Sequence, residues 1–461
     1  MDIFDSISPL DFRYYGRDKA MFDKLQPYLS ENAMIGYMLK VEVALTRTLA
    51  DKRICSKKIA DEVEKAAKNV VADEVYAEED RIKHNVRALV NMIRKRVSND
   101  AKPYVHFTTT SHDIICTAEA MRNKEAAEKI LLPELIALEK TLIAIARREK
   151  ATLQVGRTHG QHAEPITFGF ALAAYVSRLG TRIQAIKSAA SNLRGKISGA
   201  VGAYNASSLF FNDPGDFERA VLAKLGLKPA THSTQITEPE FLADYMHAIV
   251  STMGVMANLA DDMRHLQRSE IGEVGEAFGA DQVGSSTMPH KRNPINFENV
   301  KSMWKVFSPR MQTIYADQIS EHQRDLTNSA SSRFVPEMIA GLAIMASRLN
   351  KVMSKLVVDK ENLMKNFDIG RNMIIAEPLY ILLAAHNHPD AHEHVRKLTL
   401  DSQQKKVALK ELVFSDKSLE PYLKKFTKPQ LEILRHPEKY IGISAEKAEN
   451  VCKHWEKELK I

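Results

Sequence analysis

The segment GSSTMPHKRNP, residues 284–294, places two serines before a histidine, a lysine, an arginine and an Asn-Pro pair. Four glycines from Gly272 to Gly284 precede or begin it, and because glycine weakens a helix, a flexible loop is expected. Neither the Walker order nor the dinucleotide fingerprint is present, which excludes phosphate binding of those kinds. A serine on such a loop can act as a general base where cations and exclusion of water lower its pKa.

Asn293 and Pro294 predict the start of a helix, with Asn293 as the N-cap and Pro294 at the first helical position. A helix N-terminus presents free backbone N–H groups and the positive end of the helix dipole, and Lys291 adds a cation beside it. Together these groups predict a carboxylate-binding site. The alternative is a helix start with a purely structural role.

Long helices are expected to position this segment. Residues 111–150 repeat apolar side chains every three or four positions and are rich in Ala, Leu, Glu and Lys, which predicts a helix with a kink at Pro133. Similar patterns predict helices over 167–194, 240–270, 295–320 and 334–357, whereas the period-two pattern of strands is nearly absent. We predict an all-α chain built around an elongated bundle, whose apolar faces are covered in an oligomer.

Shorter elements flank the predicted bundle on both sides. The first hundred residues read as short helices and loops, and the pattern shortens again after about residue 358. We therefore expect an N-terminal helical domain at 1–107, a central long-helix domain at 108–358 and a C-terminal helical domain at 359–461.

Composition narrows the class of protein. The chain has 461 residues, of which 44% are hydrophobic and 27% charged, as in packed globular proteins. The formal charge of +7 is small for this length and fits an anionic small substrate as well as a nucleic acid. The sequence has no transmembrane or signal-peptide pattern, and its three cysteines are isolated, which disfavours a zinc site or disulfide framework. We expect a cytoplasmic protein with no membrane partner.

Residues 284–294 resemble the signature loop of the fumarase/aspartase superfamily, whose members eliminate fumarate from succinyl compounds. Five other segments, in the same order, are similar to the adenylosuccinate lyase family: SPLDFRYYG near the start, HFTTTSHD at 106–113, GRTHGQHAEP at 156–165, STQITEPE at 233–240 and QRDLTNSASSR at 323–333. The resemblance extends from about residue 5 to about residue 380. It implies a three-part helical subunit and a homotetramer in which segments of three chains meet at each site.

The chemistry that the resemblance implies is a β-elimination by a carbon–nitrogen lyase of purine biosynthesis. Fumarate would leave from adenylosuccinate, giving AMP, and from succinylaminoimidazole carboxamide ribotide, giving AICAR. Charge develops on the substrate carboxylate as an aci-carboxylate, so fixed donors and a cation aimed there would each contribute roughly 3 kcal/mol. Proton transfer and electrostatics suffice, so no metal or organic cofactor is expected.

Catalytic roles follow from the matched positions. Ser285 corresponds to the base, His159 to the acid that protonates the leaving nitrogen, and His84 to a histidine that supports this acid. Glu298 is implied to lie near His159, and Lys291 to stabilise the aci-carboxylate. Read outside the resemblance, Ser285 is a linker serine, His159 and His84 are loop or helix-surface histidines, and Glu298 is a first-turn carboxylate.

Substrate contacts are implied at further positions. A nucleotide phosphate would be held by Arg13, Tyr14, Arg324, Ser329 and Arg333, because a guanidinium fork suits phosphate oxygens. The remaining contacts would come from Asn85, Thr110, Ser111, Thr158, Gln235 and Asn293. Ser111 is also a natural N-cap for the following helix. Arg324 and Arg333 are nine positions apart, about 900° of helical rotation, so they can share one phosphate only if the LTNSASS stretch between them is a loop.

The sequence departs from the family pattern at three positions. Asn85 stands where the family commonly has Asp, and Lys83 where some members have Arg. A carboxylate beside His84 is therefore missing, which alters how that histidine is oriented. His162 replaces a common Pro, and it either titrates in the chemistry or fills the loop.

Two alternatives stay open at this point. One is another enzyme of the superfamily, such as argininosuccinate lyase or carboxymuconate cycloisomerase, although their substrates carry no phosphate for the arginines to bind. The other is a helical scaffold that binds nucleic acid through segments such as MIRKRV at 92–97. That function would give strongly salt-dependent binding to polyanions and no release of fumarate.

Overall fold

The structure, a computed structural model, describes residues 3–279, 287–288 and 290–461. These residues cluster into two compact units. Unit 1 comprises Met1–Ile136, Thr181–Met256 and Ser302–Arg348, and unit 2 comprises Ala137–Gly180, Ala257–Lys301 and Leu349–Ile461. The domain boundaries expected near residues 107 and 358 stay predictions.

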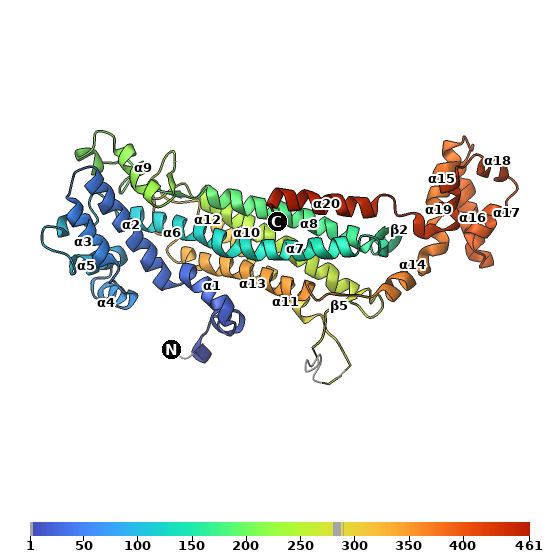
Figure 1. The fold of residues 1–461 in the computed structure, drawn as a ribbon, viewed down its shortest axis with the longest axis horizontal. Coiled ribbons are helices and arrows are strands. Elements are labelled where there is room, and N and C mark those ends of the chain that lie inside the picture. The colour runs from blue at the N-terminus through green and yellow to red at the C-terminus, as the bar shows by residue number, and fades with distance from the viewer. Residues whose placement is uncertain (1–2, 280–286, 289) are drawn as a thin grey trace. The chain divides into compact units, whose positions relative to one another are not determined.

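Helices account for most of the described residues (Figure 1). The α-helices are α1 (Lys19–Leu29), α2 (Glu31–Asp51), α3 (Lys57–Ala67), α4 (Ala72–Ile82), α5 (Asn85–Arg94), α6 (Ser111–Ala126), α7 (Leu132–Arg148), α8 (Phe168–Ser191), α9 (Pro214–Lys224), α10 (Glu240–Leu266), α11 (Ile295–Phe307), α12 (Arg310–Ala316), α13 (Val335–Met353), α14 (Lys360–Ile374), α15 (Ala376–Ala385), α16 (Ala391–Lys405), α17 (Leu409–Ser415), α18 (Glu420–Leu423), α19 (Lys428–Arg435) and α20 (Ser444–Leu459). Shorter 3₁₀ or π segments are η1 (Ile3–Asp5), η2 (Leu10–Tyr14), η3 (Lys102–Tyr104), η4 (Ala127–Leu131), η5 (Ser207–Leu209), η6 (Ser331–Phe334) and η7 (Pro437–Lys439).

The strands form three two-stranded sheets in the described part of the chain. β1 (Leu153–Thr158) pairs antiparallel with β2 (Gln161–Thr167), with a register irregularity between Val155 and Arg157. β3 (Arg194–Gly195) pairs parallel with β4 (Lys228–Pro229), and β5 (Val274–Gly275) pairs antiparallel with β6 (Val357–Val358). The β1–β2 hairpin is the longest of these pairings and was not expected from the sequence.

In unit 1, helices α3, α4 and α5 surround one end of α2 (Figure 1). Side-chain caps fix where α2 and α3 begin, because the first N–H groups of a helix have no partner within it. Ser30 accepts a hydrogen bond from Ala33 N at 3.1 Å, and Ser56 accepts one from Ile59 N at 3.3 Å. The fully buried rings of Phe217 and Tyr245 belong to this unit's core.

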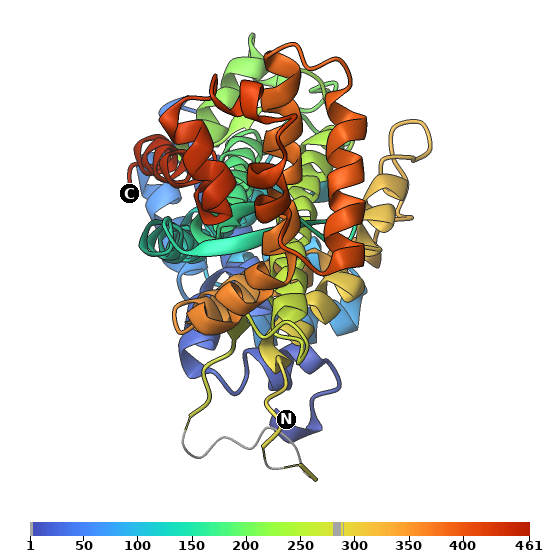
Figure 2. The same ribbon diagram turned by 90° about the vertical axis from the view of Figure 1, so that its right-hand side faces the viewer.

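In unit 2, the β1–β2 hairpin packs against α14, and α15, α16, α17 and α19 gather around a separate apolar cluster (Figure 2). The fully buried members of that cluster are Leu379, Leu383, Leu409, Val413, Leu419 and Leu434. Helix α20 approaches α8 closely, since a Cβ added at Gly180 would lie 2.3 Å from the Trp455 ring. Glycine is therefore needed at that crossing.

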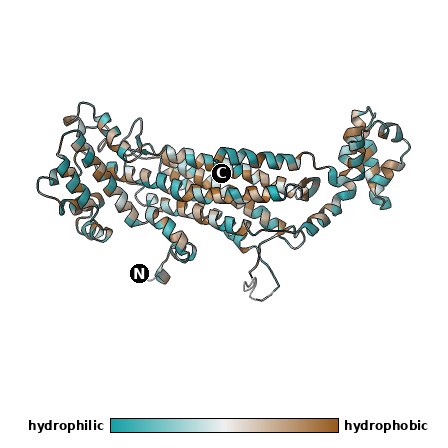
Figure 3. Cartoon of the chain, viewed as in Figure 1, coloured by the Kyte–Doolittle hydropathy of each residue, from teal (hydrophilic) through white to brown (hydrophobic). Residues whose placement is uncertain are grey.

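The all-α prediction is confirmed, and hydrophobic and hydrophilic residues alternate within individual helices as amphipathic packing requires (Figure 3). The kink predicted at Pro133 stays a prediction; Pro133 lies in the first turn of α7, directly after the π-helical segment η4. Proline lacks the N–H that would continue the regular ladder. The prediction of one continuous helix over 295–320 is wrong, because the chain turns at Ser308 and Pro309 and forms two helices, α11 and α12.

Among the described residues, no helix combines the length and the apolar character that crossing a membrane requires.

Glu139 lies fully buried in α7, and neither of its carboxylate oxygens has a hydrogen-bond partner among the described residues. Burial raises the pKa of Glu139 to about 9, because the charged form loses its hydration. The folded protein therefore holds this side chain protonated at neutral pH.

We predict that Glu139→Gln flattens the pH dependence of stability. Between the ordinary carboxyl pKa and about 9, the folded state binds one more proton than the unfolded state. The free energy of unfolding thus falls as pH rises, by up to about 1.4 kcal/mol per pH unit. Thermal unfolding of both proteins from pH 6 to 9 checks this, and parallel curves would contradict it.

Candidate active site

His159 occupies the tip of the β1–β2 hairpin in unit 2. Thr158 pairs with Gln161, so His159 and Gly160 form a two-residue loop, with φ of +53° and +74°. Positive φ at both positions is the pattern of a type I′ turn, which matches the twist of paired strands. His159 is exposed and has no hydrogen bond or ion pair within the part of the chain that the structure describes. The fold thus presents the imidazole of the predicted acid at the end of a short, defined hairpin.

Hydrogen bonds to Glu273 anchor that hairpin. Its fully buried carboxylate accepts hydrogen bonds from Gln154 Nε2 at 2.8 Å, from Arg157 Nη1 at 3.1 Å and Nη2 at 2.5 Å, and from Asn366 Nδ2 at 2.9 Å. Gln154 and Arg157 belong to β1, and Asn366 belongs to α14. Charge-assisted bonds of this kind are stronger than neutral ones. One carboxylate therefore links the strand before His159 to helix α14 and to the glycine-rich stretch that precedes the signature segment.

His162, the departure from the family's proline, pairs across the hairpin with Arg157. Its Nδ1 lies 3.6 Å from the position that a Cβ would take on Gly370 of α14. Burial and the charge of Arg157 lower the pKa of His162. The two readings of His162 stay open, since its side chain is exposed on the hairpin and lies near Gly370 of α14.

The signature segment is described in part. Ser285 and its neighbour Ser286 lie outside the described residues, so the assignment of the base stays a prediction. Lys291 is exposed and its backbone N–H donates to Met288 O at 3.0 Å, while Asn293 O accepts from Ile295 N at 2.9 Å.

The predicted helix start is shifted by one residue. Helix α11 begins at Ile295, and Pro294 O accepts the first helical hydrogen bond, from Glu298 N at 2.9 Å. Pro294 therefore takes the N-cap position that was predicted for Asn293. Glu298 lies exposed in the first turn, as expected of a carboxylate near a helix N-terminus.

The free N–H groups predicted at this helix start are already occupied. Glu276 Oε1 accepts from Asn296 N at 2.9 Å and from Phe297 N at 3.0 Å. The side chain of Glu276 therefore binds the backbone N–H groups that were expected to bind the carboxylate of a substrate. The other two residues predicted to bind the substrate carboxylate, Lys291 and Asn293, take no part in this contact with Glu276.

In unit 1, His84 is the N-cap of α5. Its Nδ1 accepts a hydrogen bond from Arg87 N at 3.2 Å, so in the neutral ring Nε2 carries the proton and can donate. Asn85 Oδ1 accepts from Val86 N at 2.7 Å. A helix start, rather than a helical face, therefore orients His84, and backbone contacts replace the carboxylate that the family commonly places at position 85.

The predicted N-cap at Ser111 is wrong by one residue. Helix α6 begins at Ser111, and Thr110 is the cap, with Thr110 N donating to Asp113 Oδ2 at 2.8 Å. Asp113 is fully buried and also accepts from Lys196 Nζ at 2.5 Å. This buried ion pair fixes the backbone on which Thr110 and Ser111 stand.

A buried pair missed by sequence reasoning lies beside this helix start. Glu42, which is fully buried, accepts from His106 N at 3.1 Å, and its Oε1 lies 2.7 Å from His106 Nδ1. Burial alone lowers the pKa of His106, but the charge of Glu42 and the hydrogen bond to it outweigh burial and raise the pKa. Its backbone, like that of Thr108, has φ of +64°, which costs on the order of 1–3 kcal/mol at such residues.

The loop predicted between Arg324 and Arg333 is confirmed, since turns precede the 3₁₀ segment η6. Arg324 Nη1 donates to Asp317 O at 3.3 Å, and Ser331 Oγ donates to Asp317 Oδ2 at 2.7 Å. Both ends of the loop are thereby held at the end of α12, and Ser329 lies exposed between them. The Nε of Arg324 is buried and has no hydrogen-bond partner among the described residues.

Other predicted contacts lie near this loop. Gln235 N donates to Gln323 O at 3.1 Å, which places Gln235 beside Arg324. Burial and the hydrogen bond to Asp11 raise the pKa of Tyr15, and the nearby charge of Glu337 adds to the shift. Tyr15 follows Arg13 and Tyr14, and Glu337 lies one turn after Arg333. Unit 1 therefore brings the N-terminal segment close to the start of α13.

The predicted residues thus divide between the units. Unit 1 carries Arg13, Tyr14, His84, Asn85, Thr110, Ser111, Gln235, Arg324, Ser329 and Arg333, and unit 2 carries Thr158, His159, Lys291, Asn293 and Glu298. Within the described chain, no hydrogen bond or ion pair joins His159 to Glu298. Sequence reasoning missed Glu42, His106, Glu273 and Glu276, although the Gly160 turn flanked by pairing segments was a usable hairpin signal.

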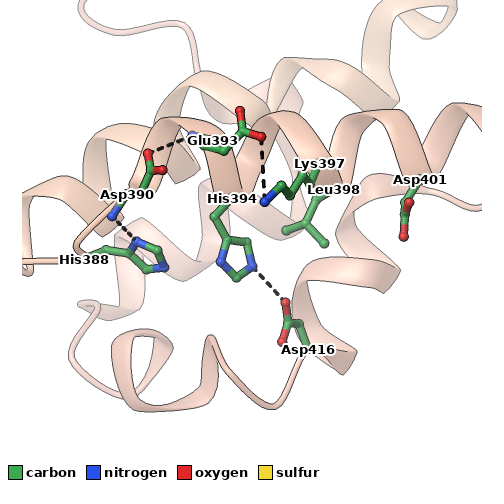
Figure 4. A pocket seen from close by; sticks show the side chains of 8 residues that line it. All are labelled: His388, Asp390, Glu393, His394, Lys397, Leu398, Asp401 and Asp416. Carbon is green, nitrogen blue, oxygen red and sulfur yellow. Dashed lines mark hydrogen bonds and ion pairs between the residues drawn. The ribbon is translucent and has the colours of Figure 1, made fainter.

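A pocket of about 330 Å³ lies elsewhere in unit 2, between α16 and α17 (Figure 4). Its polar side chains are already paired, with His394 Nε2 2.9 Å from Asp416 Oδ2 and Asp390 Oδ1 accepting from Glu393 N at 3.3 Å. None of the predicted site residues lines it, so it is not the candidate active site.

The basic segment MIRKRV is also largely neutralised. Arg96 Nη2 donates to both carboxylate oxygens of Glu74 at 2.6 Å, Lys95 lies 3.5 Å from Glu78, and Arg94 donates to Lys102 O at 3.1 Å. These contacts disfavour a nucleic-acid surface there. Among the described residues, no group of three or more His, Cys, Asp or Glu side chains is arranged to hold a metal ion.

We predict that Glu273→Ala destabilises the protein by about 3–5 kcal/mol, because it leaves the Arg157 guanidinium, only 19% exposed, without its counter-charge. Thermal or chemical unfolding at matched protein concentration measures the change. Glu270→Ala is the control, since Glu270 pairs with Arg268 at the surface and should cost under about 1 kcal/mol. Equal losses in the two variants would contradict the role assigned to Glu273.

Two family models match the chain. A lyase model covers residues 13–306, and an adenylosuccinate lyase C-terminal model covers residues 320–441. Adenylosuccinate lyase from Archaeoglobus fulgidus is 34% identical over 98% of this chain and 99% of its own length. The enzyme from Pyrococcus abyssi is 34% identical over 98% of both chains, and that from Bacillus subtilis is 33% identical over 73% of this chain and 77% of its own. The likeness thus continues beyond residue 380.

Solved structures share the fold. A fumarate lyase from Mesorhizobium sp. BNC1 aligns with a TM-score of 0.80 at 22% identity, covering 94% of this chain and 97% of that chain. The 3-carboxy-cis,cis-muconate lactonizing enzyme from Pseudomonas putida aligns with a TM-score of 0.82 at 22% identity, covering 95% of this chain and 97% of that chain. Full-length identity to named relatives, the two matching models and the shared helical fold lead to one conclusion: this chain belongs to the adenylosuccinate lyase family.

Proposed function

We propose that this protein is an adenylosuccinate lyase. It eliminates fumarate from adenylosuccinate, giving AMP, and from succinylaminoimidazole carboxamide ribotide, giving AICAR. The observation that carries the proposal is the 34% identity, over 98% of the chain, to a protein named adenylosuccinate lyase. The muconate-converting neighbour is only 22% identical, so it supports the fold and not a second function.

The chemistry needs a base and an acid acting on opposite ends of one carbon–carbon bond. Ser285 removes a proton next to a carboxylate, and the C–H electron pair forms the fumarate double bond. The C–N electron pair leaves with nitrogen, which takes a proton from His159. The exposed tip position and absence of internal partners suit His159 to this transfer, because its ring is free to meet a leaving group.

Three further residues support the elimination. Lys291 and Asn293 stabilise the aci-carboxylate that forms after proton removal, the role for which preorganised donors and cations are most effective. His84 donates from Nε2, since its Nδ1 is held by Arg87 N. Glu298 orients His159, and its exposed position in the first turn of α11 leaves it accessible to a partner imidazole.

The phosphate of the nucleotide binds at the loop between α12 and α13. Arg324 binds the phosphate through its guanidinium, which is oriented by the hydrogen bond from Nη1 to Asp317 O at 3.3 Å. Arg13, Tyr14, Ser329 and Arg333 complete this group, and Thr110, Ser111, Thr158, Gln235 and Asn85 contact the rest of the substrate. Proton transfer and electrostatics suffice, so the reaction uses no cofactor.

The working enzyme is a cytoplasmic homotetramer whose sites are shared between subunits. No hydrogen bond or ion pair joins His159 to Glu298 among the described residues, which supports a pairing between different subunits. The same arrangement accounts for site residues spread from Arg13 to Arg333.

We expect purified protein to convert adenylosuccinate to AMP and fumarate, followed by the change in absorbance. Ser285→Ala and His159→Ala should each lower kcat by at least about a hundredfold without loss of folding, because each removes one proton-transfer group. Circular dichroism is the folding control. If wild type leaves adenylosuccinate untouched, the proposed function is wrong, and full activity of Ser285→Ala would reject the assigned base alone.

Shared sites predict that two inactive variants restore each other. His84→Ala and His159→Ala, mixed under conditions that exchange subunits, should regain part of the wild-type activity, because some hybrid sites then contain both histidines. Each variant treated alone in the same way is the control. If exchange is demonstrated and activity does not return, both histidines come from one chain and the shared-site proposal fails.

A further inference from the structure

The two ends of the signature segment are fastened to each other in unit 2 by side chains that have no assigned role. The incoming end here means residues 276–278, which precede residues 284–294 in the sequence, and the outgoing end means residues 292–297, which include the last three residues of that segment and the three that follow it. Glu276, which is 4% exposed, contacts the outgoing end through both carboxylate oxygens. Oε1 accepts from Asn296 N at 2.9 Å and Phe297 N at 3.0 Å, and Oε2 accepts from Asn296 Nδ2 at 2.7 Å.

Gln267, at the end of α10, bridges the same two ends. Its Oε1 accepts from Glu276 N at 3.1 Å, and its Nε2 donates to Arg292 O at 3.2 Å. The Arg292 guanidinium in turn lies over the Phe278 ring, 5.6 Å from its centroid, in a cation–π contact. Three independent contacts therefore cross between the incoming and outgoing ends.

The charge arrangement explains why a carboxylate is needed at position 276. The first N–H groups of α11 have no helical acceptor and carry the positive end of the helix dipole. A buried anion that accepts two of them is strongly bound, and it fixes where α11 begins. Lys291 and Asn293 lie immediately before that start, so their positions depend on it.

We propose that Glu276 and Gln267 form a clamp that makes them positioning residues for Lys291 and Asn293. The clamp touches neither the substrate nor the reacting atoms. It sets the distance between the two ends of the segment, and thereby the place where the cation and the amide meet the aci-carboxylate. The inference rests on the proposed lyase function for its kinetic consequence, but the clamp itself is a property of the described contacts.

The kinetic test uses Glu276→Gln. Glutamine keeps an acceptor for the two backbone N–H groups, but it removes the negative charge at the positive end of the α11 dipole, and the Asn296 amide must turn to keep the side-chain contact. We expect kcat to fall by about ten- to a hundredfold with KM changed less than about threefold, because misplacement acts on groups that matter most in the transition state. An unchanged kcat would overturn the proposal.

A reciprocal change provides the rescue. In the double variant Glu276→Gln with Asn296→Asp, the new carboxylate accepts from the new amide, and the contact is restored with the same total charge. We expect most of the lost kcat to return. Asp390→Asn, which alters the cap of α16 remote from the signature segment in sequence, is the matched control and should leave kcat unchanged. Failure of rescue, or an equal loss in the control, overturns the positioning role.

A second readout does not depend on turnover. Hydrogen exchange of the amides of Asn296 and Phe297 should be faster in Glu276→Ala than in wild type, while amides in α16 keep their rates. If wild type shows no lyase activity, the proposed function fails, and this exchange still decides the clamp. Unchanged exchange at both amides would show that Glu276 does not hold the start of α11.

Discussion

The candidate site of unit 2 depends on burying carboxylates only where N–H donors surround them. Glu273 and Glu276, three residues apart, are 0% and 4% exposed, and burying either carboxylate without hydrogen-bond donors would be costly. The donors that compensate them come from β1, α14 and α11. Satisfying the two carboxylates therefore requires these three segments to meet beside the signature segment.

The same principle operates in unit 1 with different residues. Asp113 and Glu42 are fully buried, and their partners are Lys196 and His106. These pairs fix the backbone around Thr110 and Ser111, where Thr108 adopts a left-handed conformation that a β-branched residue rarely takes. Strain of this kind persists only where surrounding contacts impose it. In both units, the residues proposed to meet substrate are exposed or half-buried, and the residues that hold them are buried and charged.

This division explains why the residues proposed for the chemistry can be recognised in the sequence, whereas the buried residues that hold them cannot. His159 and Lys291 stand in short segments with recognisable composition, because the proposed chemistry restricts which residue types can serve. Glu273 and Glu276 look like ordinary acidic residues of a glycine-rich stretch, since their importance comes from donors more than ninety positions away in the case of Asn366. Periodicity and local propensity carry no information about such partners.

The sequence by itself determined the helical class, the loop between Arg324 and Arg333 and the family. Each of these depends on local causes: apolar spacing, turn-forming residues and contiguous motifs. The tertiary structure alone decided that β1 and β2 form a hairpin with His159 at its tip, that Glu276 occupies the N–H groups of α11, and that α11 begins at Ile295. These features arise from contacts between segments that are distant in the sequence. Burying a carboxylate is costly unless donors from those segments surround it, and local sequence patterns do not show where such donors will lie.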